Sequence, residues 1–148
     1  MNKICGGIPT QGKGQEKLLL LLKQAQSKFG YLPKELMAEL AESLCLSISD
    51  VYGVASFYSF LSTKPQGRNV IRICKCLPCL LKNAQTIIES VEKEIGIKPG
   101  EITPDGRFSF ELTNCIGACD EAPAMMLNGE VHVNLTPGKI SQILKACK

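Results

Sequence analysis

The first third of the chain has the apolar spacing of short α-helices. One helix is predicted by apolar residues three or four positions apart that end at a glycine, Gly30. A second helix follows Pro33, and a third follows the candidate N-caps Ser47 and Ser49. The apolar positions of the three expected helices are Leu18, Leu21, Leu22, Ala25 and Phe29, then Leu36, Leu40 and Leu44, then Val51, Val54, Ala55 and Tyr58.

Some apolar residues in this region lie partly outside these stripes. Leu19, Leu20 and Phe57 either pack against the rest of the chain or face another protein. We favour contact with another protein for some of them, because three short helices make only a small core.

The periodicity breaks at residues 64–69, where the sequence Lys-Pro-Gln-Gly-Arg-Asn is interpreted as a linker. The expected organisation is an N-terminal helical bundle at 1–66 and a second domain at 67–148.

The second part of the chain mixes strand and helix patterns. Residues 70–73 are mostly β-branched and predict a strand, and apolar positions within 80–95 predict one helix of about four turns. Residues 108–112 alternate between apolar and polar, as in a half-buried strand. Asn128-Gly129 predicts a hairpin turn, and Thr136-Pro137 opens a last helix. The order β-α-β and then β-β-α is that of a thioredoxin-like domain, although other α/β sandwiches share it.

Composition and charge narrow the classes of function. Of the 148 residues, 45% are hydrophobic and 21% are charged, and the formal net charge is +3. The basic residues are interspersed with acidic ones, which argues against a nucleic-acid-binding face. The longest apolar run, 18–22, is too short to span a bilayer, and the first residues lack the apolar core of a signal peptide. A cytoplasmic location is therefore expected.

Eight cysteines in a cytoplasmic chain indicate metal ligands or redox groups rather than a disulfide scaffold. Cys5, Cys45 and Cys147 are isolated in sequence and are interpreted as ordinary free thiols. The other five lie in CKCLPC at 74–79 and CIGAC at 115–119, and each cluster follows a predicted strand. Because parallel neighbouring strands end at the same sheet edge, we expect both clusters to meet there.

Three chemistries compete for these thiols. A disulfide catalyst using Cys76 and Cys79 leaves the C-x3-C pair without a role. Zinc binds four thiolates around one ion, often through tighter C-x2-C pairs. A [2Fe–2S] cluster takes two thiolates on each iron, which suits C-x4-C and C-x3-C spacings. A Rieske centre also needs two histidines, and the chain has only His132, which we interpret as a structural or surface residue.

Other residues near the two groups of cysteines suit an iron–sulfur site. Gly117 allows a positive φ, so that the loop can direct backbone N–H groups at sulfur. Lys75 and Lys82 either offset the negative charge of a reduced centre or are ordinary solvated lysines.

The motifs together resemble a known family, the small thioredoxin-like [2Fe–2S] subunits of NADH dehydrogenase complexes and of NAD(P)-linked, often electron-bifurcating, hydrogenases. The resemblance covers nearly the whole chain. Its motifs are Gly30-Tyr-Leu-Pro33, Val51-Tyr-Gly-Val-Ala-Ser-Phe-Tyr58, Cys74-x4-Cys79 and Cys115-Ile-Gly-Ala-Cys119-x-x-Ala-Pro123. It implies an α/β fold in which an N-terminal helical bundle precedes a thioredoxin-like [2Fe–2S] ferredoxin domain. The implied cluster ligands are Cys74, Cys79, Cys115 and Cys119. Cys76 has no ligand counterpart in the family pattern.

The resemblance also implies a one-electron carrier that works within a hetero-oligomer. FMN and NAD(P) are expected on a partner subunit, and this chain lacks the G-x-G-x-x-G turn of a dinucleotide site. A larger iron–sulfur or hydrogenase subunit is the second expected partner. We favour a bifurcating hydrogenase or related complex over a respiratory NADH dehydrogenase. The rivals from other classes are a thiol–disulfide oxidoreductase using Cys76 and Cys79 and a zinc-stabilised interaction module.

Overall fold

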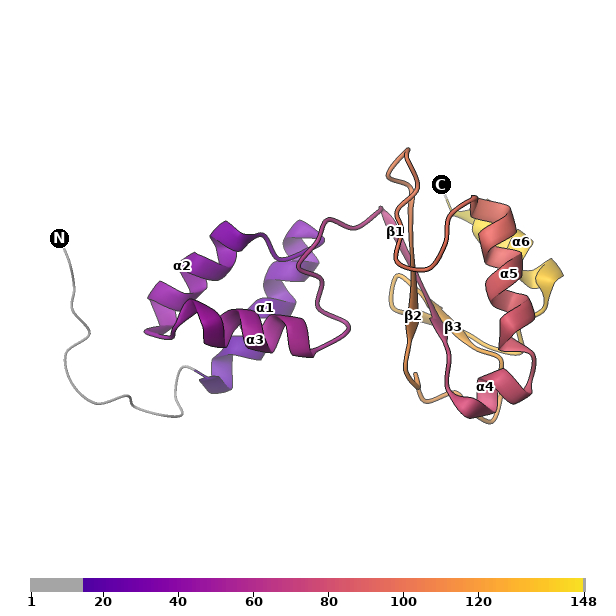
Figure 1. Ribbon diagram of the computed structural model, residues 1–148, viewed down its shortest axis with the longest axis horizontal. Coiled ribbons are helices and arrows are strands. Elements are labelled where there is room, and N and C mark those ends of the chain that lie inside the picture. The colour runs from indigo at the N-terminus through magenta and orange to yellow at the C-terminus, as the bar shows by residue number, and fades with distance from the viewer. Residues whose placement is uncertain (1–14, 148) are drawn as a thin grey trace. The chain divides into compact units, whose positions relative to one another are not determined.

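The structure is a computed structural model that describes residues 15–147, so Cys5 lies outside the described residues. The contacts within the chain divide it between Pro65 and Gln66, inside the expected linker segment. The two units are described separately below (Figure 1).

The first unit contains the three predicted helices. They are α1 (Gln15–Phe29), α2 (Lys34–Leu44) and α3 (Ile48–Phe57). Gly30 follows α1 with a φ of +79°, and the Ser47 side chain accepts a hydrogen bond from the Asp50 backbone N–H at the start of α3. Ser47, rather than Ser49, is therefore the N-cap.

The buried face of these helices differs in part from the expected one. Their core consists of Leu18, Leu22, Leu32, Met37, Ala41, Val51 and Ala55. Met37 and Ala41 form the centre of the α2 face, and the predicted stripe of Leu36, Leu40 and Leu44 packs around its margin. Phe29, which was expected to face inward, is 50% exposed because it is the last residue of α1.

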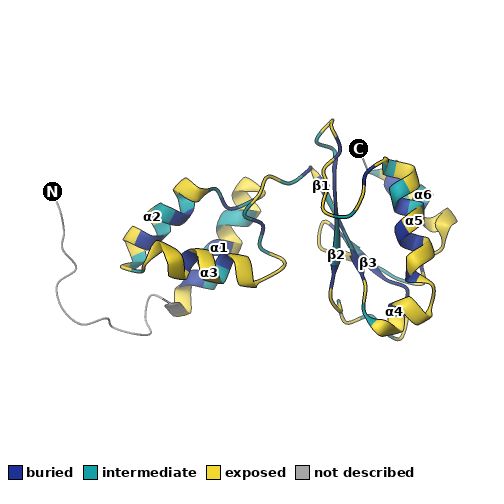
Figure 2. Ribbon diagram, viewed as in Figure 1, coloured by how far each residue is buried: buried dark blue, intermediate teal, exposed yellow. Residues whose placement is uncertain are grey.

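The second unit is a mixed four-stranded sheet with helices on one face. Its elements are β1 (Asn69–Cys74), α4 (Leu77–Leu81), α5 (Ala84–Ile95), β2 (Phe108–Thr113), β3 (Met125–Leu127), β4 (Glu130–His132) and α6 (Pro137–Ala146). The strand order is β2-β1-β3-β4, with β1 and β2 parallel and the other pairs antiparallel. Helices α5 and α6 lie side by side over the sheet (Figure 1), and the buried side of α5 contributes to the core (Figure 2).

Local signals in the sequence locate most of these elements. Asn128 and Gly129 have φ values of +51° and +93°, which is the backbone of a tight hairpin between β3 and β4. The Thr136 side chain accepts a hydrogen bond from the Lys139 backbone N–H at the start of α6. The predicted hairpin turn and the predicted start of the last helix are both confirmed.

The prediction of a single helix at 80–95 is wrong, because the structure contains two helices here, α4 and α5. Asn83 takes a left-handed conformation, φ +61°, between α4 and α5. Asparagine tolerates this conformation better than most residues. Leu80 consequently leaves the core face and is 44% exposed.

The strand β2 is covered on both faces at one point, which the alternation did not predict. Ser109 is buried, and its hydroxyl accepts a hydrogen bond of 2.6 Å from the Gly67 backbone N–H. A Cβ at Gly67 would lie 2.7 Å from the Phe108 carbonyl carbon, so only glycine fits where this segment crosses the strand. On the same face Arg72 and Glu111 form an ion pair at 2.8 Å.

Between residues 15 and 147, none of the helices combines the length and apolar character that crossing a membrane requires.

Candidate functional site

The two cysteine clusters begin at the same edge of the sheet. Strands β1 and β2 are parallel neighbours, and Cys74 at the end of β1 is paired with Thr113 at the end of β2. The Lys75 backbone N–H donates to the Thr113 carbonyl at 3.0 Å, and Cys115 follows two residues later. The prediction that parallel strands bring the clusters together is therefore confirmed.

The first cluster contributes two buried thiols. Cys74 and Cys79 are each 1% exposed and pack with Ala84 and Ala122. Cys76 is partly buried against the same group. Ile116 also packs against this group and is partly buried.

Helix α4 holds this cluster in a way that differs from the expected loop. The helix expected at 80–95 would begin after Cys76 and Cys79, whereas Cys79 lies inside α4 and Cys76 is its N-cap. Pro78 stands in the first turn of α4, where its missing N–H removes no helical hydrogen bond. Proline therefore helps to start the helix here.

The second cluster is a more exposed loop. The Cys115 and Cys119 sulfur atoms are 3.1 Å apart. Gly117 has a φ of +89°, and its backbone N–H donates to the Cys115 sulfur at 3.4 Å. Both expectations for this glycine, the positive φ and the N–H directed at sulfur, are confirmed.

A lysine connects the two clusters. The Lys82 ammonium group, just after α4, donates a hydrogen bond of 3.2 Å to the Asp120 carbonyl oxygen next to Cys119. Sequence reasoning left Lys82 as either a charge-offsetting or a solvated lysine and did not find this contact. No local signal links two residues this far apart in the chain.

The thiols influence one another electrostatically. A hydrogen bond to Cys115 and then burial raise the pKa of Cys119 to about 11. The same bond, followed by the Gly117 N–H, lowers the pKa of Cys115. Negative charge on Cys74 and Cys79 also contributes to the raised pKa of Cys119, so the two pairs lie within electrostatic range of each other.

Two thiols of the first cysteine cluster have raised pKa values, in contrast to the lowered pKa of Cys115. Burial is the main cause that raises the pKa values of Cys76 and Cys79, and the neighbouring Cys74 raises both further. Thiols must lose their protons to bind metal, so metal binding at this edge would displace protons.

The donor set suits a binuclear centre. Cys74, Cys76, Cys79, Cys115 and Cys119 are all free of disulfide bonds. Within 15–147, no three Cys, His, Asp or Glu side chains are arranged to enclose a single metal ion. A [2Fe–2S] cluster requires a different arrangement, two pairs of thiolates with one pair on each iron. Cys74 and Cys79 lie together in a buried group with Cys76 against it, and Cys115 and Cys119 lie in contact in the neighbouring loop.

The remaining residues singled out in the sequence lie elsewhere. His132 is part-buried on β4, and its Nε2 atom has no hydrogen-bond partner in the described part of the chain. Cys147 donates a hydrogen bond to the Ile143 carbonyl oxygen, and Cys45 is an exposed residue at the end of α2.

Exposed leucines surround the buried Cys79. On α4, Leu77 is 66% exposed and Leu81 is 75% exposed, and Leu80 lies beside them. The sequence pattern assigned Leu80 to the core and did not identify this patch, because the spacing continues unbroken across the turn at Asn83.

Comparisons with known proteins agree with this geometry. The model of the thioredoxin-like [2Fe–2S] ferredoxin family matches residues 1–148. The HndA subunit of an NADP-reducing hydrogenase from Solidesulfovibrio fructosivorans is 39% identical over 127 residues, which cover 86% of this chain and 74% of the relative. A subunit of the NADH-quinone oxidoreductase from Escherichia coli K12 is 41% identical over 127 residues, which cover 86% of this chain and 76% of the relative.

Among solved structures, an NAD+-reducing [NiFe]-hydrogenase in the air-oxidized state matches with a TM-score of 0.78 and 27% identity. The match covers 91% of this chain and 24% of that chain, so this protein corresponds to a small part of the hydrogenase polypeptide. From the match over the full sequence and the identity with both relatives, we conclude that the chain belongs to the thioredoxin-like [2Fe–2S] ferredoxin family.

Proposed function

We propose that the chain binds one [2Fe–2S] cluster through Cys74, Cys79, Cys115 and Cys119 and transfers single electrons as a subunit of a cytoplasmic NAD(P)-dependent oxidoreductase. The observation that best supports this proposal is that two cysteine pairs follow two parallel strands and meet at one sheet edge. When bound, a [2Fe–2S] cluster supplies one-electron storage at a potential that the protein tunes.

The two pairs have different tasks in this proposal. Cys74 and Cys79 are buried and keep water from their side of the site. Cys115 and Cys119 are on the exposed side, where an electron can be exchanged with another protein. The Gly117 N–H donates to the Cys115 sulfur and stabilises negative charge there.

FMN and NAD(P) belong to a partner subunit in our proposal. The relatives carry the names of an NADP-reducing hydrogenase subunit and an NADH-quinone oxidoreductase subunit, which supports a hetero-oligomer. We favour a bifurcating hydrogenase or related complex, with a larger iron–sulfur or hydrogenase subunit as the second partner. A respiratory-type NADH dehydrogenase subunit is the second candidate, since the relative of that kind is equally similar.

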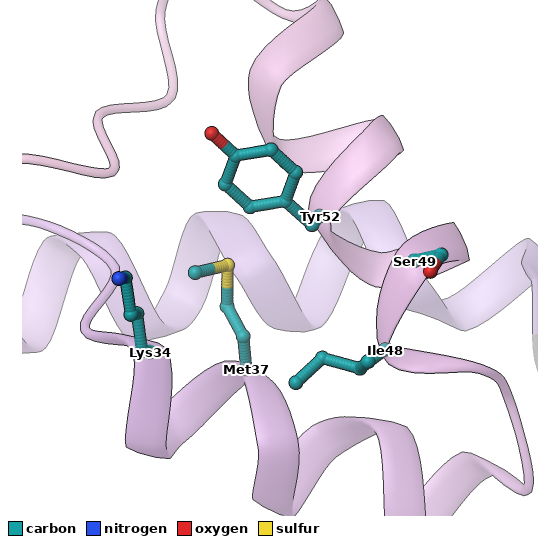
Figure 3. A pocket seen from close by; sticks show the side chains of 5 residues that line it. All are labelled: Lys34, Met37, Ile48, Ser49 and Tyr52. Carbon is teal, nitrogen blue, oxygen red and sulfur yellow. The ribbon is translucent and has the colours of Figure 1, made fainter.

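In our proposal the N-terminal helices, through Tyr31 to Phe60, are a principal docking surface for the flavin subunit. Phe57 is 79% exposed, and Tyr52 is 50% exposed on the same helix. Figure 3 shows a hollow between α2 and α3, with the Tyr52 ring and the Met37 side chain facing it. Its lining residues are Lys34, Met37, Ile48, Ser49 and Tyr52. An apolar partner surface would cover more of these side chains than three short helices can cover themselves.

Anaerobic purification with metal analysis tests the proposal. We expect about two irons and two sulfides per chain, a brown colour and one S = 1/2 EPR signal on reduction that integrates to about one spin. Stoichiometric zinc without iron would support the zinc-stabilised module instead. A colourless protein that reduces insulin disulfides would support the thiol–disulfide oxidoreductase.

A further inference from the structure

Helix α4 turns an apolar stripe outward beside the proposed cluster site. Leu80 and Leu81 are three and four positions after Leu77, so the three side chains lie on one side of the helix. They are 44%, 75% and 66% exposed, respectively, whereas Cys79 on the same helix is buried. Figure 2 shows α4 as mostly exposed. The proposed function gives this leucine stripe no task.

The backbone break at Asn83 keeps the leucine stripe out of the core. Leu80 has the helical spacing to continue the buried face of α5, which begins with Ala84 and Ile87. The left-handed conformation of Asn83, φ +61°, turns α4 away from that face. Clustered apolar side chains that remain exposed in this way commonly mark a surface that another protein covers.

Two lysines that flank α4 indicate which chemistry a partner needs. Lys75 and Lys82 are exposed, and neither forms an ion pair with a carboxylate within residues 15–147. The Lys82 ammonium donates to the Asp120 carbonyl oxygen at 3.2 Å, which holds its charge in place without neutralising it. Residues 74–83 contain no Asp or Glu, and the Glu121 carboxylate in the second cysteine loop accepts from the Asn134 amide. A complementary surface is therefore apolar at its centre and carries carboxylates opposite the two lysines.

The leucine stripe also borders the side of the site where electrons can be exchanged. Cys79, a proposed ligand, lies within α4, and Lys82 connects the end of this helix to the loop of Cys115 and Cys119. A protein docked on α4 would approach both cysteine pairs across one short helix. Electron transfer between proteins requires such a close approach, and the interfaces that serve it are small.

We propose that the leucine stripe of α4, flanked by Lys75 and Lys82, is the docking surface for a one-electron redox protein whose own docking face is apolar with an acidic rim. This inference rests on the proposed function, since the partner needs a cluster to exchange electrons with. The N-terminal helices hold the flavin subunit in that proposal. The partner for the leucine stripe is therefore the second one, the larger iron–sulfur or hydrogenase subunit.

Stopped-flow oxidation of the reduced full-length chain by the purified larger subunit tests the leucine stripe. One electron leaves the cluster of this chain and reduces an iron–sulfur centre of the larger subunit. We expect Leu81→Glu to lower the second-order rate constant at least about tenfold, because it brings a carboxylate against an apolar, acid-rimmed surface. Leu81→Met keeps an apolar side chain and should remain near the wild-type rate.

Ile102→Glu is the matched control for Leu81→Glu. Ile102 is also an exposed apolar residue of the second unit, but it is paired with Ser109 near the start of β2, whereas the cysteines follow the end of that strand. The control should react at the wild-type rate.

Lys75→Glu tests the acidic rim of the partner. We expect this charge reversal to slow the reaction about three- to tenfold at low ionic strength, because rim charges act mainly on the rate of association. The difference from wild type should shrink at about 0.5 M salt, where exposed charges are screened over a few ångströms.

Iron and sulfide analysis of the same samples separates this inference from the proposed function. Wild-type protein without iron and sulfide would refute both together. With the cluster present, three results would refute the inference alone: a wild-type rate in Leu81→Glu, equal slowing in Leu81→Glu and Ile102→Glu, or a faster reaction in Lys75→Glu. Slowing of Leu81→Glu with the flavin subunit alone would also refute it and assign the leucine stripe to that subunit. Dimers of the wild-type chain that dissociate in Leu81→Glu would refute it in favour of a second copy.

Discussion

Gly117 shows at the scale of one residue how the loop around the second cysteine pair is formed. Its φ of +89° directs a backbone N–H at the Cys115 sulfur. A Cβ at this position would meet no atom within 4 Å, so a side chain is disfavoured by backbone conformation and not by space.

We expect Gly117→Ala to destabilise the loop by about 1–2 kcal/mol, because alanine resists the left-handed region. Gly117→Asn should cost less, since asparagine tolerates positive φ. The rate of iron release to a chelator measures the effect. Gly138→Ala is the matched control, because Gly138 also has open space around it but lies in α6 without a positive φ. Equal release rates for all three variants would show that the Gly117 backbone does not matter.

Residue order predicted the meeting of the two cysteine clusters better than it predicted the details of packing. The strand before each cysteine cluster was enough to place both clusters at one sheet edge, and the ligand set Cys74, Cys79, Cys115 and Cys119 came from the family resemblance. The burial of Met37 and Ala41 in place of the leucine stripe was not predictable, because both faces of α2 carry apolar residues at helical spacing.

At the scale of elements, the short helix α4 positions the first cysteine pair and contacts the second. It is separated from α5 by Asn83, and Lys82 reaches from its end to the Asp120 carbonyl. The sequence predicted the order of elements along the chain from changes in apolar periodicity, and it predicted the hairpin from a strong turn signal at Asn128-Gly129. It missed the break at Asn83 because Leu80, Ala84 and Ile87 continue a helical spacing across it.

We expect Lys82→Ala to accelerate loss of the cluster modestly, because it removes the hydrogen bond between α4 and the second cysteine loop. A solvent-exposed hydrogen bond of this kind contributes about 1 kcal/mol or less. Chelator-induced bleaching of the visible absorbance provides the measurement. Lys75→Ala removes a nearby exposed lysine whose ammonium makes no hydrogen bond within residues 15–147, and it should bleach at the wild-type rate. Indistinguishable rates for the two variants would contradict a structural role for Lys82.

At the scale of the whole molecule, the chain carries its cysteine site and its most exposed aromatic residue in different units. The site lies in the unit that begins at Gln66, and Phe57 lies in the other. Gln66 and Gly67 contact β2 through Glu111 and Ser109, so the end of the linker belongs with the sheet. The sequence indicated the linker from the break in periodicity, but such long-range contacts have no local signal.

Phe57→Glu in the full-length chain should abolish or strongly weaken capture of the flavin subunit while the cluster is retained. The physical reason is that a charge would replace a large apolar side chain that we place in the interface. A pull-down with iron analysis of the bound and free fractions measures both properties. Ile102→Glu is the matched control, an exposed apolar residue of the other unit. Full retention of binding by Phe57→Glu would exclude Phe57 from the interface.

The isolated chain should neither oxidise NADH nor bind it measurably, because the sequence has no dinucleotide-binding turn. Activity should require addition of the flavin-bearing subunit. Calorimetric titration and NADH-dependent dye reduction measure the two properties. Robust NADH oxidation by the chain, free of flavoprotein contamination, would overturn the proposed division of labour.

The central claim is that Cys74 and Cys79 are the iron ligands within the cysteine group at 74–79. Iron and sulfide analysis of Cys79→Ser beside Cys76→Ser tests this claim most directly. Cys79 is buried within α4, and Cys76 is the partly buried N-cap of the same helix. We predict that Cys79→Ser loses or severely destabilises the cluster, whereas Cys76→Ser keeps its iron content and EPR spectrum nearly unchanged. Equal loss of iron from both variants would contradict the assignment and make Cys76 a ligand.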